Sequence, residues 1–199
     1  VVQAVLQRLD MEVPISFYPW ARAYQLAQQR QNTIIYSIVR MEERENLFEW
    51  VGEVTRHNAS FYKLKHNTGI STISALEDAK PYKVGVYLND AIHMYLVRNG
   101  FTNLDVATDS RLNLKKLLSG RIDLIAMDDA AFSFQMQRED VQIDAFDRML
   151  SIEEMSGSLY MAFSKGSDPA LISKFKRALE EIKAEGLYYQ IQRKYFPLG

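Results

Sequence analysis

Three short apolar runs alternate with helical patterns in this chain: YKVGVY at residues 82–87, LDVA at 104–107 and IDLIAM at 122–127. Each run has the length and composition of a buried strand. The residues after each run have apolar side chains at helical spacing, and Gly100 and Gly120 end the first two helical patterns. The region therefore predicts three strands that are joined by helices.

Polar residues that favour helix N-termini stand at the start of each helical pattern. They are Asn89 or Asp90 for the first helix, Ser110 for the second, and Asp128 or Asp129 for the third. We expect these side chains to cap the backbone amides of the first turn.

The alternation extends toward both ends of the chain. Toward the N-terminus we expect a helix over 1–9, a strand over 13–18, a helix over 21–30 and a strand over 33–36. Toward the C-terminus we expect one helix that begins at Asp168-Pro169 and a second helix over 187–195. Strands that alternate with helices are typical of an α/β fold with a parallel sheet and helical crossovers. A polar stretch over 55–74 separates the two blocks, and within it 60–64 is a candidate extended crossing segment; 158–163 is a second.

Composition excludes several classes of function. The chain has 199 residues, a net charge of −1 and no cysteine, so it has no disulfide, no thiolate zinc site and no thiol nucleophile. The balanced charge favours neither nucleic acid nor an anionic membrane as a partner. The apolar runs are too short to cross a bilayer. No signal peptide is present, and because the chain begins with Val1-Val2 inside a helical pattern, we expect that an upstream segment has been removed or left out.

Motifs of catalysis and of metal or phosphate binding are absent from the sequence. The glycines are scattered, and His57, His66 and His93 lack metal-ligand spacing, so we interpret each as a surface or loop residue. The sequence therefore indicates no catalytic residue, no metal and no cofactor.

Polar residues follow two of the expected buried strands directly. Residues 37–44 follow the strand at 33–36 and contain Arg44, and Asp128 follows the strand at 122–127. In an open parallel sheet, ligands bind beyond the carboxyl ends of the strands. These two segments therefore offer a guanidinium and a carboxylate where a ligand is expected.

The chain resembles the family 3 extracellular solute-binding proteins, which serve amino-acid ABC transporters. The resemblance is carried by five segments in the family's order: YPWARA at 18–23, RMEERENLFEWVG at 40–52, KVGV at 83–86, LLSGRID at 117–123 followed by Asp128, and YMAFSK at 160–165. It covers essentially the whole chain.

The resemblance implies a type II periplasmic binding fold, in which two α/β lobes close on a ligand about two hinge crossings. Lobe 1 would comprise 1–60 and 165–199, lobe 2 would comprise 66–158, and the hinges would be 61–65 and 159–164. The family's first strand would lie before Val1.

The resemblance also implies the ligand contacts. Arg44 matches the arginine that binds the ligand's α-carboxylate, for which a bidentate guanidinium is well suited. Asp128 matches the acidic residue that holds the α-ammonium. Trp20 would cover the ligand, and Ser37 and Val39 would line the pocket. A surface ion-pair cluster is the alternative for Arg44, which has three glutamates beside it, and a helix cap is the alternative for Asp128.

One segment departs from the family's pattern. The family has Gly-Thr-Thr after the Val-Gly-Val strand, and this chain has Asn89-Asp90-Ala91 there. The candidate contacts on this side are Tyr87, Asp90 and Ala91. Asp90 is interpreted first as a helix cap; if it faces the ligand, its charge favours a cationic or zwitterionic ligand over a simple anion.

The resemblance implies a periplasmic or extracellular receptor for a small polar ligand, with an ABC permease as its partner and a membrane reached only through that permease or an anchor outside this chain. An extracellular sensor domain of a signalling protein is an alternative on the same fold. A prephenate-type dehydratase is a third reading, and it would need a carboxylate acid or base such as Asp90, Asp128 or Glu153.

Overall fold

The computed structural model describes residues 1–70 and 72–195, and the chain divides into two compact units. Unit 1 comprises Val1–Tyr18, Arg22–Arg56 and Ser158–Gly199; unit 2 comprises Pro19–Ala21 and His57–Gly157. The hinge role expected for 61–65 and 159–164 stays a prediction, and these residues fall on or beside two strands described below.

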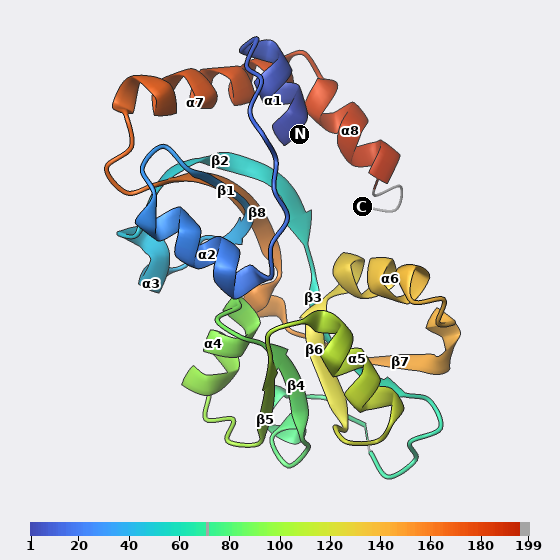
Figure 1. The fold of residues 1–199 in the computed structure, drawn as a ribbon. Helices are drawn as coiled ribbons and strands as arrows, with labels where there is room; N and C mark the ends of the chain where they lie inside the picture. The colour runs from blue at the N-terminus through green and yellow to red at the C-terminus, as the bar shows by residue number, and fades with distance from the viewer. Residues whose placement is uncertain (71, 196–199) are drawn as a thin grey trace. The chain divides into compact units, whose positions relative to one another are not determined.

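Unit 1 is built on a three-stranded sheet with the order β1-β8-β2 (Figure 1). Its elements are α1 (Val2–Arg8), α2 (Trp20–Gln29), β1 (Ile34–Val39), α3 (Glu42–Glu45), β2 (Phe48–His57), β8 (Gly157–Ser164), α7 (Pro169–Ala184) and α8 (Leu187–Tyr195). The division into units falls inside three of them, so that residues 20–21 of α2, residue 57 of β2 and residue 157 of β8 belong to unit 2. β1 runs antiparallel to β8, with Ile35 opposite Ala162.

The core of unit 1 forms where α7 packs on the sheet. Phe175, Leu179 and Ile182 recur at helical spacing on α7, and all three are buried in one cluster with Phe163 of β8. The rings of Phe163 and Phe175 meet edge to face, with centroids 5.1 Å apart. Burial of each such side chain contributes about 1.5–3 kcal/mol, so this face fixes α7 against the sheet.

Unit 2 is built on a five-stranded sheet with the order β5-β4-β6-β3-β7. Its elements are β3 (Ala59–Leu64), η1 (Leu76–Ala79), β4 (Val84–Tyr87), α4 (Ala91–Arg98), β5 (Leu104–Ala107), α5 (Ser110–Leu118), β6 (Leu124–Asp128), α6 (Asp129–Arg138), η2 (Ile143–Ala145), β7 (Phe146–Ser151) and η3 (Glu153–Met155). β4 runs parallel to β5 and β6, whereas β3 runs antiparallel to β6 and β7.

Aromatic packing joins α6 to this sheet. The Phe132 ring of α6 stacks on Tyr62 of β3 with centroids 3.8 Å apart, and it meets Phe146 of β7 edge to face at 5.2 Å. Phe132 is completely buried. Because α6 begins directly after β6, this packing fixes the turn between them, where Asp128 lies.

The structure confirms a mixed α/β fold and corrects several predictions. Residues 13–18 form no strand; Pro14 and Pro19 lack backbone donors, and Phe17 is 87% exposed. The sheets are not wholly parallel. Asp109, rather than Ser110, is the N-cap of α5, with its carboxylate accepting from the Arg111 amide.

Candidate functional site

Arg44 of α3 is fully buried within unit 1. Its Nη1 donates to the carbonyl oxygen of Val39 at 3.2 Å, and its Cζ lies 5.1 Å from the ring centroid of Tyr24. A buried charge is costly unless polar or aromatic groups compensate it. The reading of Arg44 as part of an exposed ion-pair cluster is therefore wrong. Its contact with a ligand stays a prediction.

Arg40 forms the exposed ion pair instead. Its Nε donates to Glu45 Oε2 at 2.8 Å, and its Cζ lies 5.3 Å from the Trp50 ring centroid and 5.9 Å from that of Tyr160. Hydrogen bonding from Arg40 lowers the pKa of the Glu45 carboxyl. Glu45 is thereby held in its charged form beside Arg40.

A chain of aromatic rings supports both guanidinium groups. Tyr24 meets Phe48 with centroids 5.6 Å apart, Phe48 meets Trp50 at 5.9 Å, and Trp50 meets Tyr160 at 5.8 Å. Arg44 packs on the Tyr24 end and Arg40 on the Trp50–Tyr160 end. No local sequence pattern indicates this cluster, because its members come from three separate parts of the chain, α2, β2 and β8.

Ser37 and Val39 both lie on β1. Ser37 adopts a left-handed backbone with φ of 58°, at a shift in the β1–β8 register between Tyr36 and Ile38. A non-glycine residue with positive φ inside a strand is uncommon and marks a bulge that redirects the backbone. Val39 supplies the carbonyl that holds Arg44.

Asp128 ends β6 and is the N-cap residue of α6 in unit 2. Its Oδ1 accepts a hydrogen bond from the Ala131 amide at 2.7 Å. The capping role predicted for Asp128 is confirmed, and its contact with a ligand remains a prediction. The cap fixes the position of one carboxylate oxygen.

His57 is a residue that the sequence analysis interpreted wrongly. Its side chain is 7% exposed, and its Nδ1 lies 3.2 Å from Asp128 Oδ2. Asp128 Oδ2 is buried and accepts no hydrogen bond within residues 1–70 and 72–195. His57 and Asp128 are distant in sequence and meet only through the fold, so no local motif indicates the contact.

A hydrogen-bonded network lies beside this pair. Tyr62 Oη donates to Asp129 Oδ1 at 2.8 Å, and Arg148 bonds the other Asp129 oxygen at 2.9 Å. Arg148 Nε also donates to Ser60 Oγ, and its Nη2 to Ser151 Oγ. Burial, and then the hydrogen bond to Asp129, raise the pKa of the Tyr62 phenol well above its ordinary value. The network ties α6 to β3 and β7.

The side chain of Asp90, which was expected to cap the helix after β4, does not cap it. Asp90 occupies the N-cap position of α4, but its side chain makes no capping hydrogen bond. Ala91 is buried, and Tyr87, the last residue of β4, is partly buried. Trp20 falls in unit 2 with this segment, and its Nε1 donates to the Asn89 carbonyl at 3.0 Å.

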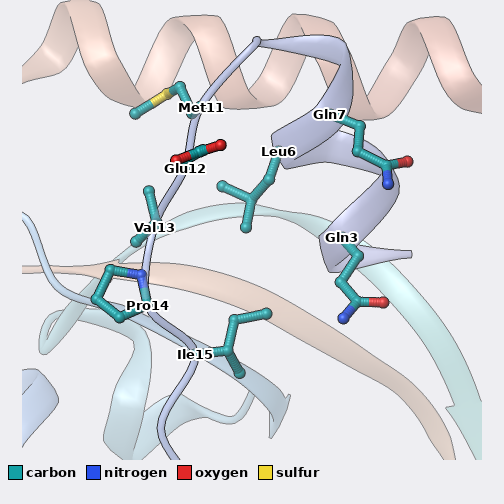
Figure 2. Close-up of a pocket in the computed structure, with 8 residues that line it drawn as sticks. All are labelled: Gln3, Leu6, Gln7, Met11, Glu12, Val13, Pro14 and Ile15. Atoms are coloured by element: carbon teal, nitrogen blue, oxygen red, sulfur yellow. The ribbon is translucent and has the colours of Figure 1, made fainter.

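A pocket of about 640 Å³ lies in unit 1 beside α1 (Figure 2). The residues that line it are Gln3, Leu6, Gln7, Met11, Glu12, Val13, Pro14 and Ile15. This wall contains no cation for a carboxylate and none of the predicted ligand contacts. We therefore do not assign the ligand to this pocket.

The described residues also show no arrangement for a metal ion and no membrane-spanning helix. No group of three or more histidine, aspartate or glutamate side chains among them is arranged to hold a metal ion. None of their helices is both long and apolar enough to cross a membrane.

Solved structures that are similar to this chain include binding proteins and a sensor domain. A histidine kinase sensor domain with similarity to periplasmic binding proteins superimposes with a TM-score of 0.87 at 16% identity, covering 98% of this chain and 83% of that one. An ancestral arginine-binding protein bound to arginine gives 0.82 at 22% identity, covering 98% and 85%. The arginine-, lysine-, histidine-binding protein ArtJ from Geobacillus stearothermophilus gives 0.81 at 17%, covering 98% and 83%. These identities show the fold alone.

Sequence comparison shows the family. No curated protein sequence matches the chain significantly. The profile of the bacterial extracellular solute-binding proteins, family 3, matches residues 1–198, which is nearly the whole chain. The chain therefore belongs to the bacterial extracellular solute-binding proteins of family 3.

Proposed function

We propose that this protein is a receptor for an amino acid or a related small zwitterion and delivers it to an ABC-type permease. The observation that carries the proposal is Arg44: a guanidinium buried in unit 1, directly after β1, in a chain of the solute-binding family. Desolvation strengthens an ion pair, so a buried guanidinium is suited to a ligand carboxylate.

The proposed mechanism is closure driven by the ligand. Arg44 would bind the ligand's carboxylate from unit 1, and Asp128 would bind its ammonium group from unit 2. A ligand that makes both contacts favours the closed state by its differential affinity for that state. The permease would then recognise the closed receptor in the periplasm. On this proposal the protein is not an enzyme, and its contacts serve binding alone.

Screening for ligands tests the proposal directly. The amino acids, polyamines and small organic acids are added singly, and the melting temperature is recorded. A ligand at 100 times its Kd stabilises the folded state by about 2.7 kcal/mol, which is easily detected. No shift with any amino acid or related zwitterion would contradict the proposal.

Arg44→Met then tests the role of the guanidinium. Loss of one partner of a buried charge pair costs about 2–5 kcal/mol, so affinity should fall roughly 30-fold to several thousand-fold. Arg30→Met is the matched control, because Arg30 is exposed at the end of α2. If the two variants bind the ligand with equal affinity, the assignment of Arg44 as a ligand contact is wrong.

An extracellular sensor domain is the second candidate function. The resemblance in fold to a histidine kinase sensor domain, with a TM-score of 0.87, favours it. A gene that continues from this chain into a membrane helix and a signalling domain would support the sensor, whereas a gene beside an ABC permease would support the receptor.

A further inference from the structure

His57 is the first residue of the long unit 2 segment and the last residue of β2. Its imidazole is nearly buried and faces the side chain of Asp128 at 3.2 Å. The adjoining backbone holds the two residues in place. Ala59 pairs with Asp128 across β3 and β6, and the Asp129 amide donates to the Asn58 carbonyl at 2.8 Å. The contact is therefore built into the sheet and is not a chance approach of two surface side chains.

The two oxygens of the Asp128 carboxylate have different surroundings. Oδ1 accepts from the Ala131 amide at 2.7 Å, while Oδ2 is buried and accepts no hydrogen bond among the described residues. The Asp128 side chain is 23% exposed overall. Because Oδ2 is buried, a ligand would have to reach the carboxylate through Oδ1. A carboxylate oxygen has two lone pairs, so Oδ1 retains one beyond the cap.

We propose that His57 is a positioning residue for the ligand site: its imidazole holds the buried Oδ2, so that Oδ1 faces the ligand's ammonium group. This inference rests on the proposed function of Asp128. The Ala131 amide and the His57 ring hold the carboxylate from its two ends, which fixes the plane of the group. A fixed carboxylate loses less conformational freedom when the ligand binds.

Substitutions at His57 test this role through rescue. His57→Leu replaces the imidazole with an apolar side chain of similar bulk that has no nitrogen. His57→Asn keeps an N–H near the position of Nδ1. Without the ring nitrogen the Asp128 carboxylate is free to reorient, and ordering it again on binding should make His57→Leu bind the ligand from the screen roughly two- to tenfold more weakly. His57→Asn should recover most of that loss. His66→Leu, in a loop of the same unit, is the control.

Isothermal titration calorimetry measures the affinities, and circular dichroism confirms that each variant is folded. Full affinity in folded His57→Leu overturns the inference. Equal losses in His57→Leu and His57→Asn also overturn it, because they would show that the ring's volume matters and its nitrogen does not. If His57→Leu does not fold, the histidine resonances described below still test the contact between His57 and Asp128.

A second measurement needs no ligand. In ¹⁵N-histidine-labelled protein at a fixed pH, Asp128→Asn should move the His57 imidazole resonances and leave those of His66 unchanged. Unmoved His57 resonances would show that the pair does not exist, and would overturn the inference without bearing on the receptor function. Shifted His57 resonances in a protein that binds no compound would refute the proposed function, and the ligand-positioning role with it.

Discussion

Asp128 caps α6 and is proposed to bind the ligand, and two substitutions separate these roles. Asp128→Ala removes both the cap of α6 and the carboxylate. Asp128→Ser removes the carboxylate but keeps a side-chain oxygen that can accept from the amides of the first turn, because serine is as good an N-cap as aspartate. The pair of variants therefore tests capping through stability and ligand binding through affinity.

The expected magnitudes follow from the contacts of the two oxygens. Oδ1 accepts from the Ala131 amide at 2.7 Å, and loss of such a cap costs about 1 kcal/mol. For a chain of this size, that lowers the melting temperature by roughly 2–4 °C. Asp128→Ser should lose only a small part of this stability. Both variants lose the partner of the ligand's ammonium group, so both should bind about 2–5 kcal/mol more weakly.

Urea unfolding measures the stability, and calorimetry with the ligand from the screen measures the affinity. We expect the two variants to differ in stability and to agree in affinity. Wild-type affinity in Asp128→Ser would refute the assignment of Asp128 to the ligand. Equal stability of Asp128→Ala and Asp128→Ser would show that the cap adds nothing to the folded state.

Three further predictions concern the scaffold. Gly85→Ala should destabilise unit 2 by about 1–3 kcal/mol in urea unfolding, because the added Cβ would lie 2.5 Å from Ile122 Cδ1. Gly69→Ala is the control and should have little effect, because the atom nearest to its added Cβ would be 3.4 Å away. The pKa of the Tyr62 phenol is raised in the folded state, so folding favours the protonated phenol. This contribution to stability is fully present below the ordinary tyrosine pKa of about 10, and it is lost as the pH rises above that value, where the phenol of the unfolded chain ionises. The stability of the wild type should therefore fall relative to Tyr62→Phe by about 1 kcal/mol at about pH 11, and a constant difference across pH would contradict this. Asp168→Ala should cost about 1 kcal/mol through loss of the α7 cap, while Asp168→Ser should not; thermal melts distinguish them.

The sequence best predicts the elements in which apolar residues recur regularly and a capping or turn residue marks the boundary. The run at 104–107 is β5 with the expected bounds, and the helix expected at Asp168-Pro169 is α7, capped by Asp168. Periodicity works here because one face of each element is buried in its own unit. β2 and β7 were missed because charged residues interrupt them: Glu49 and Glu53 in β2, and Asp147 in β7.

The contacts within the candidate site were predictable only in part. Asp128 could be assigned as a cap because capping depends on neighbouring residues. The burial of Arg44 could not, because its three neighbouring glutamates indicate a surface and only the packed fold brings Tyr24 beneath it. The contact of His57 with Asp128 depends on the pairing of β3 with β6, and a single sequence carries no signal for that pairing.

β8, the last strand among the described residues, lies in the middle of the unit 1 sheet, between β1 and β2. During synthesis, all five strands of unit 2 can pair once residue 157 has left the ribosome. At that point β1 and β2 still lack β8, the strand that lies between them. Pairing across such a distance along the chain is slow, because a long loop must close first. We therefore expect unit 2 to fold first on the ribosome. Until β8 arrives, the open edges of β1 and β2 are where a chaperone would bind and where aggregation would begin.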